Sequence, residues 1–350
     1  MRIAVYGASG YQGRLVLAEL ARRGIEPVLT GRDPARLERA AAAAGLPDAR
    51  RRVADTTDHE ALVGAFRGCD GVINCAGPFT WSGEAVVRAA ITAGCHYVDT
   101  SGEQLHVKKV FDAFAAEAES AGVAVVPAAN DGCVPVDLVA HVLADRLGPV
   151  EEVVTAHAVA GGGGMSRGSL RSAIATIDAI RAGGIAYHDG DWRTGVPARR
   201  AAVMLPGRPE PTPVTPFPVS EVVTIPRHIR VRHVQGLAEA ALGDRLSVPP
   251  APEVIDGLPD GPGQDARRAQ RFTYLVDATG TDGRRVRGLV QGSDTYGTTA
   301  VIVVEAARRL IAGAAEPGVH APAQAYDPAA FLDVLAPHGL RWTIQDAPPV

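Results

Sequence analysis

The sequence predicts an α/β fold in which a doubly wound parallel sheet carries an inserted α+β domain. Two observations lead to this prediction. Over residues 1–148, short apolar strand patterns alternate with helical patterns, which is typical of the βαβ units of a parallel sheet. Near residue 150 this alternation ends, and shorter strand patterns separated by Pro- and Gly-rich loops continue to about residue 295. A strongly apolar helical pattern over 298–311 then follows, so we expect the chain to return to its first part.

The turn after the first strand pattern carries three evenly spaced glycines. Residues 2–6 predict a buried strand and residues 12–23 a helix, and the glycines lie at the junction. In a dinucleotide-binding turn, such glycines permit the tight bend, close approach of the backbone to the pyrophosphate, and close helix–strand packing. The helix N-terminus adds unpaired N–H groups for the anion. The turn therefore predicts a Rossmann-type site, with contacts from Gly7, Ser9, Gly10, Tyr11, Gln12 and Gly13.

The end of the second strand pattern, over residues 26–30, favours NADPH as the cofactor. An NAD site usually carries Asp or Glu at this tip, whereas an NADP site carries an arginine for the 2′-phosphate. The tip here holds Arg32, and Asp33 precedes Pro34 in the pattern of a helix N-cap. We therefore expect NADPH rather than NAD, with Arg32 on the 2′-phosphate and Asp55 beside the adenine. The alternative for Arg32 is a solvated loop charge.

These patterns divide the chain into three parts. They are a dinucleotide-binding Rossmann domain over 1–148, an α+β substrate domain over 149–295, and a segment over 296–350 that returns to the first domain. Within the second part, residues 166–180 predict one amphipathic helix and residues 222–231 a strand. Thr281-Asp282-Gly283 predicts a hairpin turn. We expect a mixed sheet with one open face.

The turn after the fourth strand pattern is expected to meet the nicotinamide and its ribose, because ligands of parallel sheets bind at the carboxyl ends of the strands. Its members are therefore assigned to the cofactor: Asn74, Cys75, Ala76, Gly77 and Pro78. Capping of its own turn is an equal alternative for Asn74.

Four side chains are candidates for chemistry on a substrate. Tyr97 and Asp99 lie on one face of the fifth strand pattern, and Asp131 follows the sixth, so these three are candidate proton donors. Arg167, where a predicted helix begins, is a candidate anchor for a carboxylate or phosphate. The alternative for Arg167 is a surface arginine.

Five further residues have both a functional and a structural interpretation. Glu103 is a candidate acid or the first-turn acid of the next helix, and His228 is a general acid or a histidine on a strand surface. Tyr296 and Thr298 line the site or cap a helix. Cys133 follows Asn-x-Gly, which resembles the nucleophile loop of semialdehyde dehydrogenases, although no partner histidine is evident.

Composition excludes several other classes. The net charge of −4 argues against nucleic acid and anionic membranes as partners, and no apolar run approaches the roughly 20 residues that span a bilayer. The four cysteines lack zinc or C-x-x-C spacing, so we predict no metal and reduced thiols. A strand pattern that starts at residue 2 leaves no signal peptide, so we expect a cytoplasmic protein. The lysines Lys108 and Lys109 are preceded four residues earlier by Gln104 and Leu105, not by tyrosine. The sequence therefore lacks the Tyr-x-x-x-Lys dyad of short-chain dehydrogenases.

Several motifs together resemble the saccharopine dehydrogenase-like NAD(P)-dependent reductases, including the trans-acting enoyl reductase group. They are VYGASGYQG at 5–13, LTGR at 29–32, VINCAGPF at 72–79, CHYVDTSGE at 95–103, VPVDL at 134–138 and GVHAP at 318–322. The resemblance is dense over 1–148, loose over 150–295 and present again over 296–340. It implies NAD(P)-linked redox chemistry, a nucleotide domain closed by the C-terminal segment, and a homodimer built on the inserted, dimerisation domain.

We therefore expect an NADPH-dependent oxidoreductase that transfers hydride to a C=N or activated C=C bond, as an imine or enoyl reductase does. The expected partner is a small metabolite or biosynthetic intermediate, which the resemblance does not identify. The first alternative is a dinucleotide-binding sensor without turnover. The second is a semialdehyde dehydrogenase-type enzyme that uses Cys133.

Overall fold

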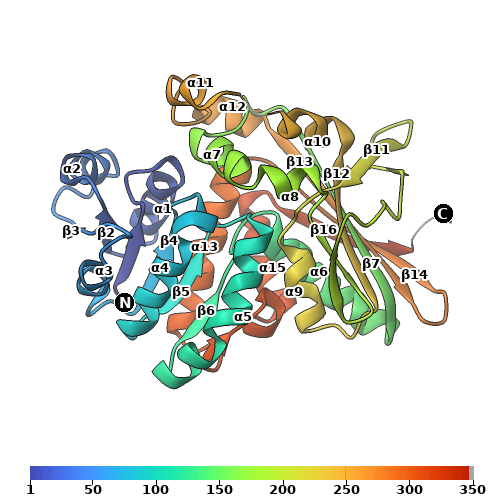
Figure 1. Ribbon diagram of the computed structural model, residues 1–350, viewed down its shortest axis with the longest axis horizontal. Coiled ribbons are helices and arrows are strands. Elements are labelled where there is room, and N and C mark those ends of the chain that lie inside the picture. Colours follow the sequence, from blue (N-terminus) through green and yellow to red (C-terminus); the bar gives the residue numbers. More distant parts are fainter. Residues whose placement is uncertain (249, 347–350) are drawn as a thin grey trace.

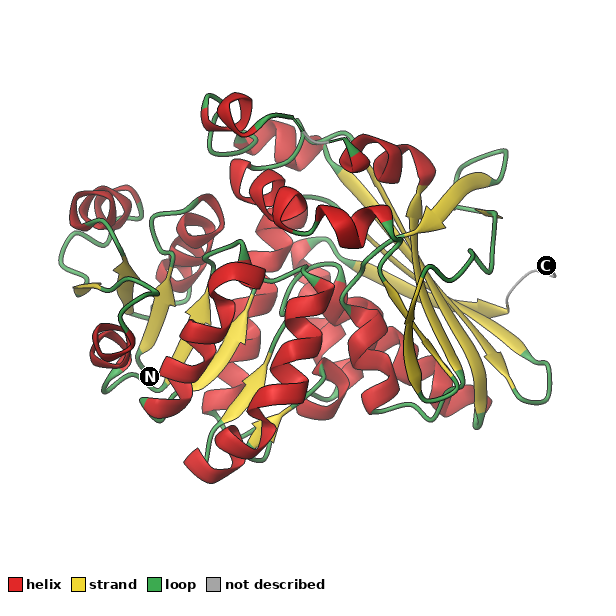
Figure 2. Cartoon of the chain, in the orientation of Figure 1, coloured by secondary structure: helices red, strands yellow, loops and turns green. Residues whose placement is uncertain are grey.

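Two β-sheets lie side by side, with helices between and around them (Figure 1). The computed structural model describes residues 1–248 and 250–346. Within these residues, seven strands form a parallel sheet and nine form a mixed sheet. Figure 2 shows helices on both faces of the parallel sheet. The predicted fold class, a doubly wound sheet with a second α+β domain, is confirmed.

The parallel sheet is built from the predicted alternation of strands and helices. Its strand order is β15-β6-β5-β4-β1-β2-β3, and every pairing is parallel. Its strands are β1 (Ile3–Tyr6), β2 (Pro27–Gly31), β3 (Arg51–Val53), β4 (Gly71–Asn74), β5 (His96–Asp99), β6 (Ala124–Val126) and β15 (Gly318–Val319). The connecting helices are α1 (Tyr11–Arg22), α2 (Pro34–Ala43), α3 (His59–Phe66), α4 (Phe79–Thr92) and α5 (Gln104–Ala121).

Strand β1 shows how the sheet is covered on both faces. Ile3 and Val5 belong to one apolar core with α1, α2 and the C-terminal helix α13 (Thr295–Ile311). Ala4 and Tyr6 belong to a second core with α3, α4 and α5. The predicted cap of α2 is also present, because the Asp33 carboxylate accepts the backbone N–H of Arg36 at 3.0 Å.

The mixed sheet has the order β10-β11-β12-β7-β13-β14-β16, and β8 joins it through β12. Only the β12–β7 pairing is parallel within the described strands. Its strands are β7 (Val150–Ala160), β8 (Ile185–His188), β9 (Asp191–Thr194), β10 (Ala202–Val203), β11 (Thr212–Pro216), β12 (His233–Glu239), β13 (Arg271–Gly280), β14 (Arg285–Gly292) and β16 (Arg341–Asp346). The predicted hairpin joins β13 to β14.

Helix α6 (Cys133–Leu147) connects the two sheets. Its apolar side chains share one core with β6 of the parallel sheet and with β13 and β14 of the mixed sheet. The opposite face of the mixed sheet, which we expected to be open, instead buries a small cluster in which Val203 and Leu205 cover Leu237 and Leu275. The apolar side chains of the 201–216 segment supply this cover.

Two local predictions in the second domain are wrong. The helix expected over 166–180 is broken into α7 (Arg167–Ala175) and α8 (Ile177–Arg181), because Thr176 leaves the helical region and bonds back to Ser172 O at 2.8 Å. The strand expected over 222–231 is instead α9 (Glu221–Thr224) and the 3₁₀ turn η1 (Ile225–Arg227). Pro226 has no N–H for a strand ladder.

Short helices complete the described chain. They are α10 (Ala240–Ser247), α11 (Pro252–Asp256), α12 (Gln264–Ala269), α14 (Pro322–Ala325), α15 (Pro328–Leu335) and the 3₁₀ turn η2 (Ala336–His338). Figure 1 shows α7, α10, α11 and α12 along one side of the molecule, above the space between the two sheets.

The C-terminal segment returns to the parallel sheet, but only in part. Helix α13 lies against α1, and β15 pairs with β6. The last strand, β16, pairs with β14 in the mixed sheet instead. The alternation of Trp342 and Ile344 with polar residues suits this half-buried edge. Residues 341–346 were predicted to return to the first domain with the rest of 296–350, but they join the mixed sheet.

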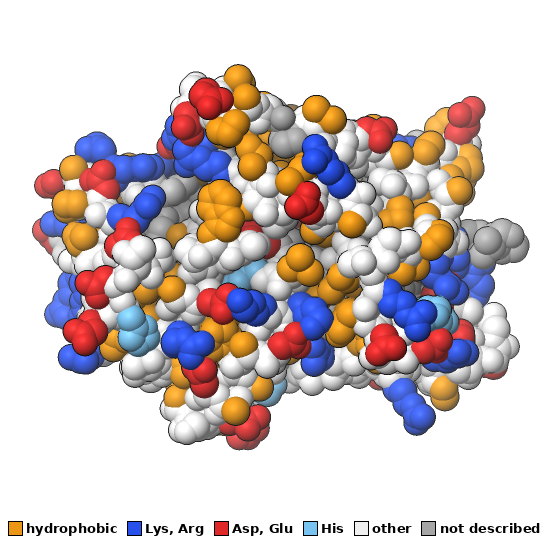
Figure 3. All heavy atoms as spheres, in the orientation of Figure 1, with side chains coloured by type: hydrophobic (Ala, Val, Ile, Leu, Met, Phe, Trp, Pro, Cys, Tyr) orange, Lys and Arg blue, Asp and Glu red, His pale blue; other side chains and the backbone are white. Residues whose placement is uncertain are grey.

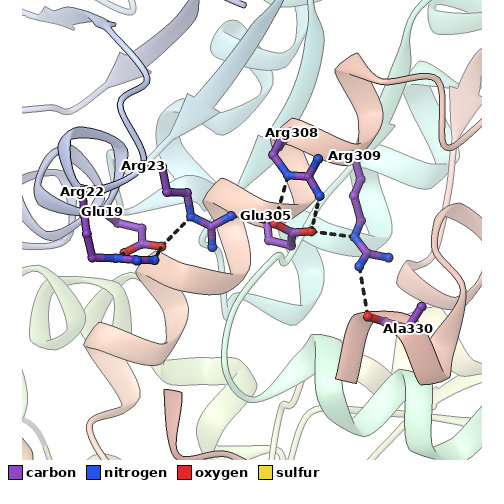
Figure 4. A network of polar contacts seen from close by, with 7 residues as sticks. All are labelled: Glu19, Arg22, Arg23, Glu305, Arg308, Arg309 and Ala330. Carbon is purple, nitrogen blue, oxygen red and sulfur yellow. Dashed lines mark hydrogen bonds and ion pairs between the residues drawn. The ribbon is translucent and has the colours of Figure 1, made fainter. Parts of the chain in front are cut away.

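A polar network fixes α13 to α1 (Figure 4). The Glu305 carboxylate is buried and accepts Arg23 Nη1 at 2.6 Å, Arg308 Nη2 at 2.7 Å and Arg309 Nε at 2.8 Å. Arg23 also bonds Glu19 of α1, and Arg309 Nη2 donates to Ala330 O at 3.0 Å. Burial works to raise the pKa of Glu305, but the hydrogen bonds from the three arginines outweigh it and lower the pKa to about 2.

The surface carries both signs of charge. Figure 3 shows acidic and basic side chains interspersed over one face, in line with the small net charge. No helix within residues 1–248 and 250–346 is apolar over a length that could cross a bilayer.

Candidate functional site

The glycine loop after β1 is packed too closely to admit side chains. Gly7 has a φ of +77°, and a Cβ there would lie 3.0 Å from the Ala76 nitrogen. A Cβ on Gly13 would lie 2.2 Å from the Gly7 carbonyl oxygen. Gly10 is the N-cap of α1 and offers no side-chain cap. The first turn of α1 therefore presents uncapped N–H groups beside a bare backbone, which fits a pyrophosphate.

Arg32 lies at the tip of β2 with its side chain 76% exposed. Its nearest ionic partner is Asp55, with Arg32 Nε 3.9 Å from Asp55 Oδ2. Hydrogen bonds from the N–H and hydroxyl of Thr57, with a smaller effect of Arg32, lower the pKa of Asp55. Asp33 is used in the α2 cap, so no acid competes for a ribose hydroxyl at the tip. The guanidinium of Arg32 is thus available to a phosphate.

Two of the predicted cofactor side chains contact the other parts of the chain. The Tyr11 hydroxyl donates to Pro262 O at 2.6 Å, and its ring packs edge-on against Tyr296 at 5.0 Å. Gln12 Nε2 donates to Tyr296 O at 3.1 Å. The contact of Ser9 is local, because its backbone carbonyl accepts a hydrogen bond from Arg14 Nη1 in the following helix. The side chains of Tyr11 and Gln12 therefore hold the glycine loop to the interdomain junction.

The side chain of Asn74 is bonded inside the turn at 74–78 and does not face solvent. Asn74 is buried, and its Oδ1 accepts the Ala76 N–H at 3.0 Å while its Nδ2 donates to the Tyr97 hydroxyl at 3.1 Å. Burial raises the pKa of the Cys75 thiol well above its usual range. Gly77 is exposed, and Pro78 is the N-cap of α4. Of the two interpretations of Asn74, the turn cap is the one that its contacts support.

Tyr97 and Asp99 do share one strand face, but that face is interior. Both are fully buried. The Tyr97 hydroxyl donates to Asp99 Oδ2 at 3.0 Å, His106 Nε2 lies 3.2 Å from the same oxygen, and Asp99 Oδ1 accepts the Ala128 N–H at 2.8 Å. Burial and Asp99 raise the pKa of Tyr97 well above its usual range. Their burial argues against direct contact with a substrate, and their role as proton donors stays a prediction.

Glu103 caps a different helix from the one expected. Its Oε1 accepts the Phe79 N–H at 2.8 Å and its Oε2 accepts the Thr80 N–H at 2.6 Å, both in the first turn of α4. Ser172 of α7 donates to Oε1 at 2.6 Å. Glu103 therefore joins the start of α4 to the second domain, and it is buried.

Arg167, the candidate anchor for a substrate anion, is already bonded to acidic and carbonyl oxygens of its own chain. It is ion-paired with Asp260, and its Nη1 donates to Asp256 O at 3.1 Å. Asp260 also pairs with Arg14 Nη2 of α1 at 2.9 Å. Burial opposes the effect of these arginines, but their hydrogen bonds and charges lower the pKa of Asp260. In this structure Arg167 therefore joins the domains, and its role as a substrate anchor stays a prediction.

Cys133 has none of the features of a nucleophile. It is buried, and its Sγ lies 3.8 Å from Thr224 Oγ1. Burial, followed by the charges of Asp137 and Glu221, raises the pKa of the thiol well above its usual range. A reactive cysteine needs the opposite shift. The semialdehyde dehydrogenase alternative is therefore contradicted.

The remaining candidates lie near the starts of helices or are buried against a carboxylate. The Tyr296 hydroxyl accepts the Ser166 N–H at 2.7 Å at the start of α7. Thr298 Oγ1 donates to Ser293 O at 3.1 Å, as a capping residue does. His228 follows the η1 turn and is buried, with Nε2 2.9 Å from Asp137 Oδ1. It is therefore not a strand-surface histidine.

Asp131 is the predicted proton donor that reaches the interface between the domains. It is half-buried, and its Oδ1 accepts the Thr299 hydroxyl at 2.9 Å. Its Oδ2 accepts the hydroxyl of Tyr274, which lies on β13 of the mixed sheet. Burial raises the pKa of Asp131 against the opposing effect of the Tyr274 and Thr299 hydrogen bonds.

Sequence reasoning missed a histidine–carboxylate pair beside Asp131. His157 of β7 lies with Nε2 2.8 Å from Glu221 Oε1, and its ring stacks on Tyr274 at 4.2 Å. A Cβ on Gly132 would lie 3.2 Å from His157 Cε1, so the ring touches the loop after β6. The side chain is 12% exposed. The signal for His157 was a polar residue among apolar ones in a strand pattern, whereas nothing local marked Glu221.

The pair can hold and release one proton at a defined atom. Glu221 also accepts the Thr155 hydroxyl at 2.8 Å, so its carboxylate is the acceptor and His157 Nε2–H the donor. His157 Nδ1 is then the nitrogen that gains or loses a proton. Tyr274 stays protonated, because burial and Asp131 raise its pKa well above the usual range. This arrangement suits general acid–base chemistry.

Comparison with known proteins supports the sequence resemblance. Residues 3–126 match the family model of the saccharopine dehydrogenase NADP binding domain. A lipid droplet localized protein of Caenorhabditis elegans is 33% identical over 146 residues, which are 39% of this chain and 34% of that protein. The predicted resemblance to this family is confirmed for the nucleotide-binding part of the chain, and NADP(H) as the cofactor type is confirmed with it.

Two further relatives match over similar parts. The saccharopine dehydrogenase-like oxidoreductase of Homo sapiens is 28% identical over 212 residues, or 55% of this chain and 45% of that protein. A trans-acting enoyl reductase of Mycobacterium ulcerans is 30% identical over 148 residues, or 41% and 35%. The match thus spans less than half the length of each relative.

One solved structure matches the whole fold. The apo saccharopine dehydrogenase (L-Glu forming) of Saccharomyces cerevisiae superposes with a TM-score of 0.63 and 14% identity, covering 98% of this chain and 99% of that one. The two proteins therefore share the arrangement of both domains.

Proposed function

We propose that this chain is an NADPH-dependent reductase, because its residues 3–126 match the NADP binding domain of saccharopine dehydrogenase. The proposed reaction is hydride transfer to a C=N or an activated C=C bond of a small metabolite. The observation that carries the proposal is a proton-holding pair, His157 and Glu221, against the loop after β6, at the carboxyl edge of the nucleotide-binding sheet.

In the proposed reaction, each part of the site has one task. The glycine loop and Arg32 hold the dinucleotide, which supplies a hydride when bound. His157 Nδ1 donates the proton that the reduced bond requires, and Glu221 stabilises the imidazolium before the transfer. Asp131 and Tyr274 hold the loop after β6 against the ring of His157. The side chain of Glu221 is 1% exposed and that of His157 is 12% exposed, so the pair is largely shielded from water.

Binding and turnover measurements test the proposal in sequence. We expect purified protein to bind NADPH more tightly than NADH, and to oxidise NADPH with at least one member of a panel of imines, enoyl thioesters and enones. Binding without oxidation across the panel would contradict the reductase and support the sensor alternative. Absence of NADPH binding would contradict both.

The family resemblance also supports a homodimer. Light scattering on the purified chain of 36.4 kDa tests this, with twice that mass expected. A monomer would contradict it.

A further inference from the structure

We propose that the second domain holds a second ligand site, a pocket that binds a small organic anion through a pair of histidines. The pocket lies between the C-terminal half of α6 and the residues that follow η1. Helix α6 starts at Cys133, beside the candidate site, and rises by 1.5 Å per residue, so the pocket lies roughly 15 Å away along the helix. The inference does not depend on the proposed reductase function.

The pair rests on a buried carboxylate. Asp137 of α6 is fully buried. Its Oδ1 accepts the Thr224 hydroxyl at 2.5 Å and lies 2.9 Å from His228 Nε2, and its Oδ2 accepts the Ala323 N–H at 2.9 Å. Three donors from separate segments thus converge on one acceptor, which is how a buried carboxylate is accommodated.

The carboxylate fixes where protons sit on the two rings. Asp137 accepts from His228 Nε2–H, so a neutral His228 has a lone pair on Nδ1. His141 Nδ1 lies 3.0 Å from that atom and must donate to it. The free position is then His141 Nε2, on a side chain that is 30% exposed.

One proton at most can be added to this pair. When His141 Nε2 gains a proton, the proton between the two Nδ1 atoms can move to His228. The contact between the two Nδ1 atoms still holds a single hydrogen. Two added protons would place two N–H groups against each other across 3.0 Å. The pair therefore changes by a single positive charge, exposed at the pocket.

The pocket has the size and the walls of a metabolite site. Its volume is about 860 Å³, within the range of small-molecule sites. Both histidines line it, and its apolar wall is formed by Ala144, Val150, Tyr187, Ile229 and Val231.

The charges around the pocket favour an anion. Arg230 is exposed and makes no ion pair within the described chain, whereas Arg232 bonds Asp189 at 2.8 Å and Glu151 at 3.0 Å. Asp145 is the acid among the lining residues, 73% exposed and 3.9 Å from His141 Nε2. The two acids that bond Arg232 balance its charge, so Arg230 and one protonated histidine pair face one solvated carboxylate, Asp145. A carboxylate or a phosphate group of a small metabolite satisfies this set.

Nuclear magnetic resonance of the histidine side chains tests the proposal without any turnover. The full chain, labelled with ¹⁵N-histidine and saturated with NADPH, is titrated with inorganic phosphate in one arm and succinate in the other. We expect the ring nitrogens of His141 and His228 to shift in at least one arm. The arm that responds identifies the anion class.

Variants make the test specific. Arg230→Ala should weaken the anion about tenfold, and Arg36→Ala, an exposed arginine on α2, should not change it. His141→Gln should abolish the shift of the remaining His228 signal when the anion is added. The proposal is overturned if neither anion moves the two histidines, or if Arg230→Ala binds as the wild type does. Because the histidine signals are local, this failure is distinct from a failure to bind or oxidise NADPH.

Discussion

The two sheets use their polar side chains in different ways. In the parallel sheet, Asn74 and Asp99 lie at strand ends and Tyr97 lies within β5. Their side chains bond to neighbouring turns and to one another. In the mixed sheet, His157 and Tyr274 sit within long strands and reach outward to a helix and to a loop of the other domain. Polar residues at the carboxyl edge of a parallel sheet can therefore stabilise that edge, while the proposed proton donor comes from the neighbouring sheet.

The largest expected effect is on the mixed-sheet side of this comparison. His157→Gln should lower kcat/KM for the responsive substrate about 10²- to 10³-fold, because it removes the proton donor. It should also remove a limb of the pH–rate profile. His59→Gln, an exposed histidine at the start of α3, is the matched control. An unchanged kcat/KM in His157→Gln would remove the assignment.

The next effect concerns the ion network that joins the two ends of the nucleotide-binding domain. Glu305→Gln should reduce the free energy of unfolding by about 3 kcal/mol, because it leaves Arg23 and Arg309 beside a neutral partner. Urea denaturation at neutral pH measures this. Glu38→Gln, an exposed acid on α2, should change little.

The same network has a pH signature. The folded pKa of Glu305, about 2, is below its ordinary value of 4.5, so the folded state binds fewer protons there than the unfolded state. Its stabilisation is present above pH 4.5 and is lost as the pH falls toward about 2. The stability difference between wild type and Glu305→Gln should therefore shrink over this interval. A constant difference would contradict the assignment.

A smaller effect tests the cofactor end of the parallel sheet. Arg32→Ala should weaken the binding of NADPH about tenfold and leave the binding of NADH unchanged, because the guanidinium contacts only the 2′-phosphate. Fluorescence titration measures both affinities, with Arg36→Ala as the control. Equal affinities of the wild type for the two cofactors would contradict the role of Arg32.

The smallest effect sharpens the contrast between the sheets. Tyr97→Phe removes one buried hydroxyl and should cost about 1 kcal/mol of stability. Its kcat/KM should stay within about threefold of the wild type, since the ring remains buried and the loop after β6 is held by other contacts. A loss as large as that of His157→Gln would return Tyr97 to the catalytic group.

The sequence allowed the fold and the nucleotide loop to be predicted, because both depend on local signals. Strand and helix periodicity, the glycines from Gly7 to Gly13 and the Asp33–Pro34 cap act within a few residues. The partners of polar side chains, in contrast, are not determined by nearby residues, so they could not be predicted in this way. His157 and Glu221 are 64 residues apart, and Arg167 is paired with Asp260, 93 residues away. Burial of Tyr97 and Asp99 likewise depends on α4 and α5, which strand alternation does not report.

The contact between α1 and α13 has a consequence for synthesis of the protein. Helix α13 closes one face of the parallel sheet, yet it begins at Thr295, almost 150 residues after the last residue of α6. At about 5–20 residues per second, a ribosome needs on the order of ten seconds to cover that distance. During this interval the apolar face formed by Ile3, Val5 and Leu17 has no α13 to cover it. We therefore expect the nascent first domain to bind chaperones until α13 has been made.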